Sequence, residues 1–227
     1  MVFAHLKPQT VEFFGELLSG QGGIVGDKAC KFVVNGQLMI KNSFSTGVIG
    51  RYGGGILGAY GGTGEKNNSS VGHSDCFIQK CYTSGDILEY AGGIVGAYAG
   101  EGFYYPAGNW PGSDELISFG KIRVEKCFTR GDIHSNAGGI MGAYAGYFEH
   151  NKDKLNIITQ DNIKVSNSYS ISNMVNDANG SGGIVGAEPF IVYVNKTYYT
   201  GKINGTNTGG IIGCDNNNSF NVKVDFS

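Results

Sequence analysis

The chain has 227 residues, 39 of them glycine and four proline, and its 17 basic and 19 acidic residues give a formal charge of −2. This composition excludes a collagen-like or proline-rich protein, and the near-neutral charge gives no electrostatic footprint for nucleic acid. No apolar stretch reaches the roughly 18 residues that a membrane helix needs, so we predict no membrane span.

Residues 1–21 precede the first glycine motif and are expected to form an N-terminal cap. Residues 11–18 are the one stretch whose spacing allows a helical capping turn, and the opening residues lack the features of a signal peptide. The odd number of cysteines, without a CxxC pair, predicts reduced thiols. Both features favour a virion or another particle assembled in the cytoplasm, with the cell surface or the extracellular space as the alternative. The cysteines are Cys30, Cys76, Cys81, Cys127 and Cys214.

Residues 22–213 contain six copies of a Gly-Gly-Ile motif, each with a further glycine three residues after the second one. An upstream segment with a small residue precedes five of these copies at a nearly constant distance, which indicates one repeated structural unit. The second glycines are 27 to 46 residues apart along the chain. The motifs begin at Gly22, Gly54, Gly92, Gly138, Gly182 and Gly209.

Alternating apolar and polar residues, as around Ile122 and Val124, indicate strands within each unit. We therefore predict an all-β fold, a parallel β-solenoid of about six glycine-rich rungs with degenerate terminal caps. A propeller fits less well, because a 27-residue repeat is too short for a four-stranded blade.

A corner is expected in the first strand of each unit, at Asn42, Lys80, Lys126, Asn167 and Lys196. Because side chains alternate along a strand, this corner turns the following small residue inward. Without the corner, the small residue lies on the outer face. The small residues are Ser43, Cys81, Cys127, Ser168 and Thr197.

Residues 214–227 alternate apolar and polar side chains without a following glycine pair and predict a C-terminal cap strand. The whole chain, 1–227, is then one repeat domain. Since exposed strand edges pair with other chains unless they are capped, the two caps favour lateral docking over end-to-end growth.

Two segments carry a resemblance to a known repeat: CYTSGDILEYAGGIVGAYAG at 81–100 and CFTRGDIHSNAGGIMGAYAG at 127–146. They resemble the GLUG motif, a glycine-rich repeat of adhesin-like surface proteins and IgA-peptidase-related proteins, also found in proteins of protists and large DNA viruses. The resemblance covers roughly residues 13–214 and implies a β-helical spacer, adhesive or surface module. The chain has no HExxH motif, so the resemblance does not extend to peptidase activity.

Asp86 and Asp132 occupy the same place in adjacent repeats, where two carboxylates would stand about 5 Å apart. That separation suits a retaining glycosidase or a shared calcium ion, while the alternative is that each Asp caps its own turn. Residues 53–58 satisfy GxGxxG, but they are one of six equivalent copies, which favours a structural role over nucleotide binding.

The insertion at 101–115 holds four aromatic residues that form either a platform for a sugar or a protein, or a cover for the side of the solenoid. They are Phe103, Tyr104, Tyr105 and Trp110.

We therefore expect a non-enzymatic structural or adhesive module with no catalytic residue, cofactor or metal. It would dock onto, or form part of, a virus particle or cell envelope through its loops and flat faces. Its partners would be proteins, further copies of itself included. The alternative is a glycan-binding or glycan-cleaving β-helix protein that uses Asp86 and Asp132 or the 101–115 loop.

Overall fold

The computed structural model describes residues 11–30, 36–67, 70–72, 74–105, 116–118, 120–149, 162–214 and 223–225. These residues form no helix, and hence none that crosses a membrane. Their strands belong to two parallel sheets of six strands each and two smaller sheets. The predicted all-β class is therefore confirmed for the described part of the chain.

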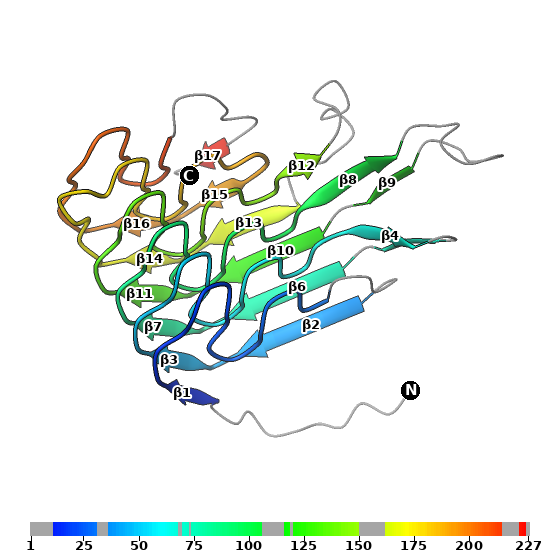
Figure 1. Cartoon of the computed structure of the whole chain (residues 1–227), viewed down its shortest axis with the longest axis horizontal. Helices are drawn as coiled ribbons and strands as arrows, with labels where there is room; N and C mark the ends of the chain where they lie inside the picture. The colour runs from blue at the N-terminus through cyan, green and yellow to red at the C-terminus, as the bar shows by residue number, and fades with distance from the viewer. Residues whose placement is uncertain are drawn as a thin grey trace.

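Five successive layers each contribute one strand to both of the large sheets, and the repeats lie on one another as layers (Figure 1). The first sheet consists of β2 (Gly36–Lys41), β6 (Ser74–Gln79), β10 (Gly120–Glu125), β13 (Ile163–Ser166), β15 (Tyr193–Asn195) and β17 (Lys223–Asp225). The second sheet consists of β1 (Glu12–Phe14), β3 (Phe44–Thr46), β7 (Tyr82–Ser84), β11 (Phe128–Arg130), β14 (Tyr169–Ser170) and β16 (Tyr198–Tyr199). Equivalent residues of successive repeats thus form columns that run through the layers.

The predicted corner separates the first-sheet strand from the second-sheet strand in every layer that contains both. Its five residues all adopt a left-handed backbone, with φ between 48° and 56°. This conformation costs a non-glycine residue on the order of 1 kcal/mol, and Asn tolerates it better than Lys. The corner reverses the side-chain parity, as the sequence predicted.

The small residue after the corner points inward, as predicted: Ser43, Cys81, Cys127 and Ser168 are at most 2 % exposed. Thr197, in the last layer that has a corner, is half-buried. The Cys127 thiol donates to the carbonyl of Glu125 at 3.4 Å and accepts the Cys81 N–H, also at 3.4 Å. A small side chain with a donor and an acceptor is therefore what this column needs.

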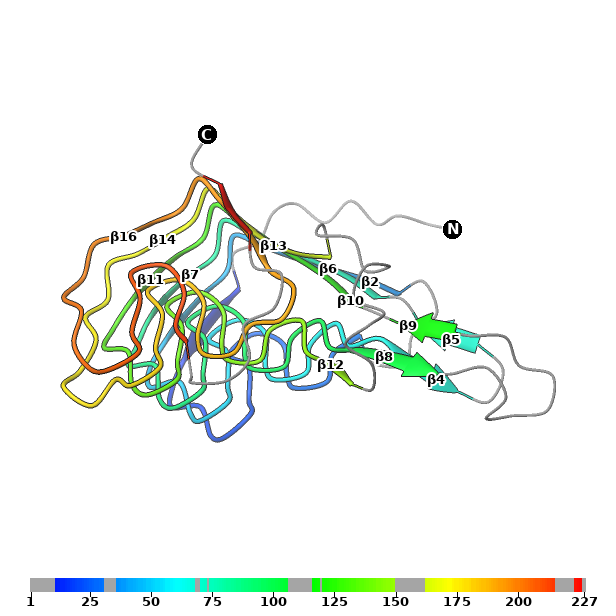
Figure 2. The same ribbon diagram turned by 90° about the horizontal axis from the view of Figure 1, so that it is seen from above.

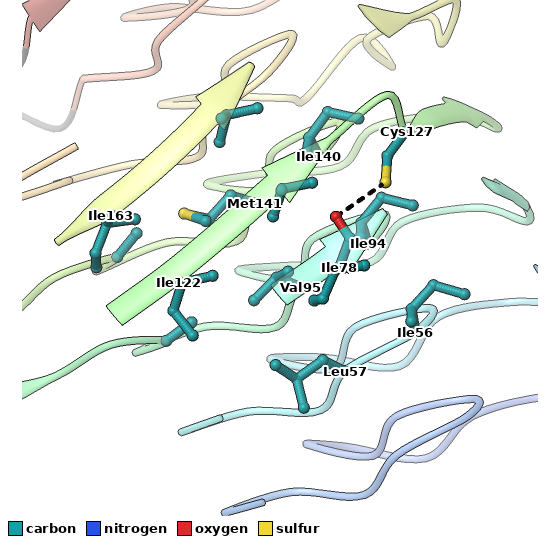
Figure 3. Close-up of a cluster of buried hydrophobic side chains, with 14 of the residues drawn as sticks. Ile56, Leu57, Ile78, Ile94, Val95, Ile122, Cys127, Ile140, Met141 and Ile163 are labelled. Carbon is teal, nitrogen blue, oxygen red and sulfur yellow. Dashed lines mark hydrogen bonds between the residues drawn. The ribbon is translucent and has the colours of Figure 1, made fainter. Parts of the chain in front are cut away.

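Apolar side chains fill the space behind the sheets, and Figure 3 shows the larger of two buried clusters. Its inward columns include Ile78 and Val124 from the first sheet and Ile94 and Val95 after the glycine pair, all with no exposed surface. Burying one such side chain contributes about 1.5–3 kcal/mol, so the repeated columns supply the main stabilisation.

The second glycine of every motif but the last lies against the next layer. At Gly139, a Cβ would stand 2.1 Å from the Gly183 carbonyl oxygen and 2.5 Å from Ser170 Oγ. No side chain fits there, because real Cβ contacts are more than 3 Å long. The glycines thus permit the close spacing of the layers, which answers why the motif recurs.

The insertions between layers leave the stack on one side (Figure 2). One forms an antiparallel hairpin of β4 (Glu65–Asn67) and β5 (Ser70–Gly72). A second pairs β8 (Gly102–Tyr105) with β9 (Leu116–Ser118), and β12 (Phe148–Glu149) joins β8 in parallel. Variable lengths between repeats therefore change this side and leave the columns intact.

Residues 11–18 do not form the helical capping turn that their spacing suggested. They contain strand β1, which pairs in parallel with β3. That pairing supplies the backbone hydrogen bonds that an isolated helical turn would have to make alone, so it prevails over local spacing.

Candidate docking surface

Aromatic rings form an unbroken strip along the outer face of the second sheet. We call this set the aromatic strip: Phe44, Tyr82, Phe128, Tyr169 and Tyr198. Neighbouring ring centroids are 4.8 to 5.2 Å apart, and neighbouring planes are within 10° of parallel. Five rings at the spacing of sheet strands make a strip roughly 20 Å long.

The register of the second sheet places these rings together. Phe128 pairs with Tyr82 on one side and with Tyr169 on the other. The residue that follows each ring is small and buried in four layers, such as Thr129 after Phe128, so the ring itself must point outward. Tyr198 is 52 % exposed, and the other four rings are half-buried.

A second group of rings lies near the glycine motifs. It consists of Tyr52, Tyr60, Tyr90, Tyr98 and Tyr144, which we call the tyrosine cluster. All five adopt a left-handed backbone, with φ from 55° to 61°. Tyr98 stacks between Tyr60 and Tyr144 at 4.9 and 4.7 Å.

Burial raises the pKa of Tyr98, and the adjacent Tyr144 raises it further. Burial also raises the pKa of Tyr60, with an added effect of the Glu101 charge. Both phenols therefore remain neutral over the physiological range. The guanidinium of Arg51 lies 5.0 Å from the Tyr52 ring and 5.3 Å from the Tyr90 ring, which places a cation against these two rings.

A surface hollow of about 380 Å³ lies where the tyrosine cluster ends in the first layer. There, Gly20 occupies the column of Tyr52, and Lys28 occupies the column of Tyr60. Both columns thus lose their rings in this layer. The hollow is lined by Tyr52, Tyr60, Tyr98, Ala59, Ser19, Gly20, Asp27 and Lys28.

Asp86 and Asp132 lie in adjacent layers, as their equivalent positions predicted, and both are exposed. The Asp86 carboxylate accepts the backbone N–H of Asp132 at 3.1 Å. Asn173 does the same for the N–H of Lys202 at 3.1 Å, so a side-chain oxygen in one layer accepts from the next layer. This contact differs from the predicted cap, in which each Asp would serve its own turn.

Three of the four aromatic residues of the 101–115 insertion lie in β8, one strand of a hairpin. Phe103 is half-buried in β8, which also includes Tyr104 and Tyr105, whereas Trp110 lies outside the described residues. Figure 2 shows β8 and β9 extending away from the two large sheets. The described part of the insertion therefore does not lie over the aromatic strip.

Residues 53–58 occupy the same place as the other glycine motifs. Gly54 forms parallel bridges to Gly22 and Gly92, and no helix follows among the described residues. The part of the chain that the structure covers also holds no group of three or more His, Cys, Asp or Glu side chains suited to a metal ion. All five cysteines are free thiols.

Comparison with protein-family models, with curated proteins and with solved structures found no match to this chain. What the chain does must therefore be argued from its own geometry.

Neither aromatic group was predicted from the sequence. A signal for the strip was present, because an aromatic residue follows the small residue in each unit, as in Cys81-Tyr82 and Cys127-Phe128. The Gly-Ala-Tyr repetition pointed in the same way to Tyr60, Tyr98 and Tyr144. The apolar alternation predicts which side chains point inward, and it does not predict that the outward rings stack on one another.

Proposed function

We propose that the chain is a non-enzymatic β-solenoid of about six rungs, of the GLUG type, that serves as a structural or adhesive module. It docks onto or forms part of a surface assembly, a virus particle or a cell envelope. The aromatic strip is the observation that carries this proposal. The docking face is the outer face of the second sheet.

The strip has the chemistry of a protein-binding surface. Aromatic residues dominate the energetics of protein interfaces, since they bury a large area and lose little conformational freedom. The rings already hold one another in parallel, so little further ordering is needed when a partner binds. A flat partner surface would cover several layers at once.

The test compares two triple variants in the same three layers. The strip variant replaces three of the five rings with Thr, which favours strands, and so preserves the sheet: Tyr82→Thr, Phe128→Thr and Tyr169→Thr. The control, Phe77→Thr, Arg123→Thr and Lys164→Thr, changes the outward column of the first sheet, whose register is equivalent. Each protein is co-sedimented with purified particles or envelopes from its source.

We expect the wild type and the control to sediment with the assembly and the strip variant to remain in the supernatant. Circular dichroism must show that both variants are folded at the temperature of the assay. Equal sedimentation of the strip variant, or no sedimentation of the wild type, would overturn the proposal.

Glycan binding is the second candidate, and the hollow beside Tyr52 and Tyr60 favours it. Its size is in the range of small-ligand sites, and its lining joins apolar rings to the polar side chains of Asp27 and Lys28. Cleavage has less support than binding, because Asp86 is exposed and accepts a backbone hydrogen bond.

Gly20→Tyr tests the glycan candidate by filling the hollow. A Cβ at Gly20 would meet only Ala59 Cβ, at 3.9 Å, and its φ of 77° resembles the 60° of Tyr52 in the same column. Saturation-transfer NMR against a panel of saccharides should give signals for the wild type and none for the variant. A wild type that binds no saccharide rules this candidate out.

A further inference from the structure

The two large sheets are offset by one layer at their ends. The second sheet begins with β1, one layer before β2 begins the first sheet, while the first sheet extends to β17, one layer beyond β16. Each end of the molecule is therefore a half-layer. The outer edges of β1, β2, β16 and β17 have no strand partner within the described residues.

A second copy, shifted by six layers along the stack, complements these half-layers. Its β2 would lie beside β17, and its β1 would lie beside β16, with every strand parallel as in the rest of the sheets. The single strand of the last layer and the β1 part of the first layer would then complete one full layer. The glycine-motif bridges would continue in the same way, from Gly209 to Gly22 and from Ile212 to Val25.

Exposed apolar side chains are concentrated at these two ends. Among the described residues, the large hydrophobic side chains that are exposed are Val11, Phe14, Leu18, Met39, Tyr198 and Ile203. The first four lie in or beside β1 and β2, and the last two lie in or beside β16. The buried cluster also ends in half-buried residues there, such as Ile24 and Val25 at one end and Ile212 and Val224 at the other.

Charges at the two ends are complementary in register. The column that starts with Lys41 in β2 runs through Gln79, Glu125, Ser166 and Asn195 to Asp225 in β17. In a shifted copy, Lys41 would therefore adjoin Asp225.

A second column, whose residues directly precede the buried Leu17 and Ile49 in the sequence, also has opposite charges at its two ends. It starts with Glu16 and ends with Lys202. The shift thus places the end charges of the Lys41 column and of the Glu16 column in opposite-charge contact.

Gly26 is a glycine that the isolated molecule does not require. A Cβ there would meet nothing within 4 Å. At the equivalent Gly58, a Cβ would stand 2.7 Å from the Asp27 nitrogen and 2.8 Å from the Gly20 oxygen of the layer before it. Gly26 needs to be glycine only if another layer precedes it.

From these observations we propose that copies of this chain stack head to tail, with the β16–β17 end of one copy against the β1–β2 end of the next. The contact is heterologous, so it does not close on itself and grows into an open filament. This self-assembly adds end-to-end growth, which the expected terminal caps disfavoured, to lateral docking through the aromatic strip. The two contacts share Tyr198 and otherwise use different surfaces.

The first experiment is sedimentation velocity of the purified full chain over a range of concentrations. We expect species that grow beyond the dimer as the concentration rises, with rods in negative-stain micrographs. A wild type that stays monomeric up to submillimolar concentration, or that stops at a dimer, overturns the proposal. A monomeric wild type would mean that the chain's own residues cover the outer strand edges at the two ends.

Charge reversal then tests the register. Lys41→Asp and Asp225→Lys should each weaken association by about threefold to tenfold, because an attraction becomes a repulsion. The double variant should recover the wild-type association. Within one molecule the two residues are roughly 24 Å apart, so only a contact between copies explains the recovery. A double variant weaker than either single variant contradicts the register.

Gly26→Ala gives an independent check with its own control. Its thermal unfolding midpoint, measured at a concentration where the protein is monomeric, should match that of the wild type. Its association should fall below detection, because the new methyl group would collide with the preceding copy as it would at Gly58. Undiminished association of this variant overturns the proposed contact. The monomeric Gly26→Ala variant should still bind particles or envelopes through the aromatic strip as the wild type does. This result would separate self-assembly from lateral docking.

Discussion

The inward position of the second sheet differs between the middle layers and the end layers. In the middle it holds small residues: Ser45, Thr83, Thr129 and Ser170. At the two ends the same column holds Phe13 and Tyr199. Each middle strand of the second sheet pairs with a strand on both sides, whereas β1 and β16 each pair with a strand on one side only. Residue size in this column thus distinguishes the end layers of one molecule from its middle layers.

The glycines follow the same rule. A Cβ at Gly139 would overlap the next layer, whereas at Gly210, in the last motif, its nearest contact would be Ile203 Cδ1 at 3.6 Å. The same residue in the same motif is thus sterically required in the middle and not at the end. Two pairs of variants test this difference between the layers, and a further change tests the burial of Tyr98.

The largest effect is expected for Gly139→Ala. A methyl group 2.1 Å from the Gly183 carbonyl oxygen would force the layers apart, at a cost of about 3 kcal/mol or more in the free energy of unfolding. Gly210→Ala is the matched control and should stay within about 0.5 kcal/mol of the wild type. Urea unfolding of the monomer measures both. Equal losses in the two variants would mean that layer contacts do not explain the glycines.

A smaller effect is expected along the aromatic strip. Phe128 stacks on Tyr82 and on Tyr169, whereas Tyr198 stacks on Tyr169 alone. Each stacked pair contributes about 0.5–1.5 kcal/mol beyond its buried area. Phe128→Ala should therefore destabilise the monomer about twice as much as Tyr198→Ala in the same urea assay. A larger loss of stability in Tyr198→Ala than in Phe128→Ala would mean that ring stacking between layers does not stabilise the fold.

The smallest effect is expected at alkaline pH. Burial raises the pKa of Tyr98 above its usual value of 10.0, so the unfolded chain loses this proton before the folded chain does. The stabilisation is complete below about pH 10 and is lost as pH rises from there through the raised pKa. Tyr98→Phe removes one titrating group and should make the loss of stability above pH 10 less steep. Melting temperatures from pH 8 to pH 11 measure the slope, and an unchanged slope would contradict the assignment.

Parity and spacing were enough to predict part of this structure. The alternation of apolar residues and the constant position of the small residue predicted the corner at Lys80 and Lys126 and the inward direction of Cys81 and Cys127. These predictions succeeded because five successive layers repeat the same local pattern, so that five weak signals support one another.

Other features depend on contacts that no single repeat encodes. The half-layer offset follows from where the chain enters and leaves the two sheets, which the periodicity leaves open. The hydrogen bond from Asp132 N–H to Asp86 joins two layers. The sequence of one turn contains only one of these partners, so it predicted a cap within the same repeat. Strand β1 formed for the same reason, through a partner 32 residues later in the sequence.

The uniform columns also set how such a protein can change its length. Cys81 and Cys127, equivalent residues of adjacent layers, are 46 residues apart. Duplication of one such segment would insert a whole layer that matches its neighbours on both faces, because the same columns continue through it. The height of the molecule would grow by about 4.8 Å per duplicated segment, and both of its end surfaces would stay as they are.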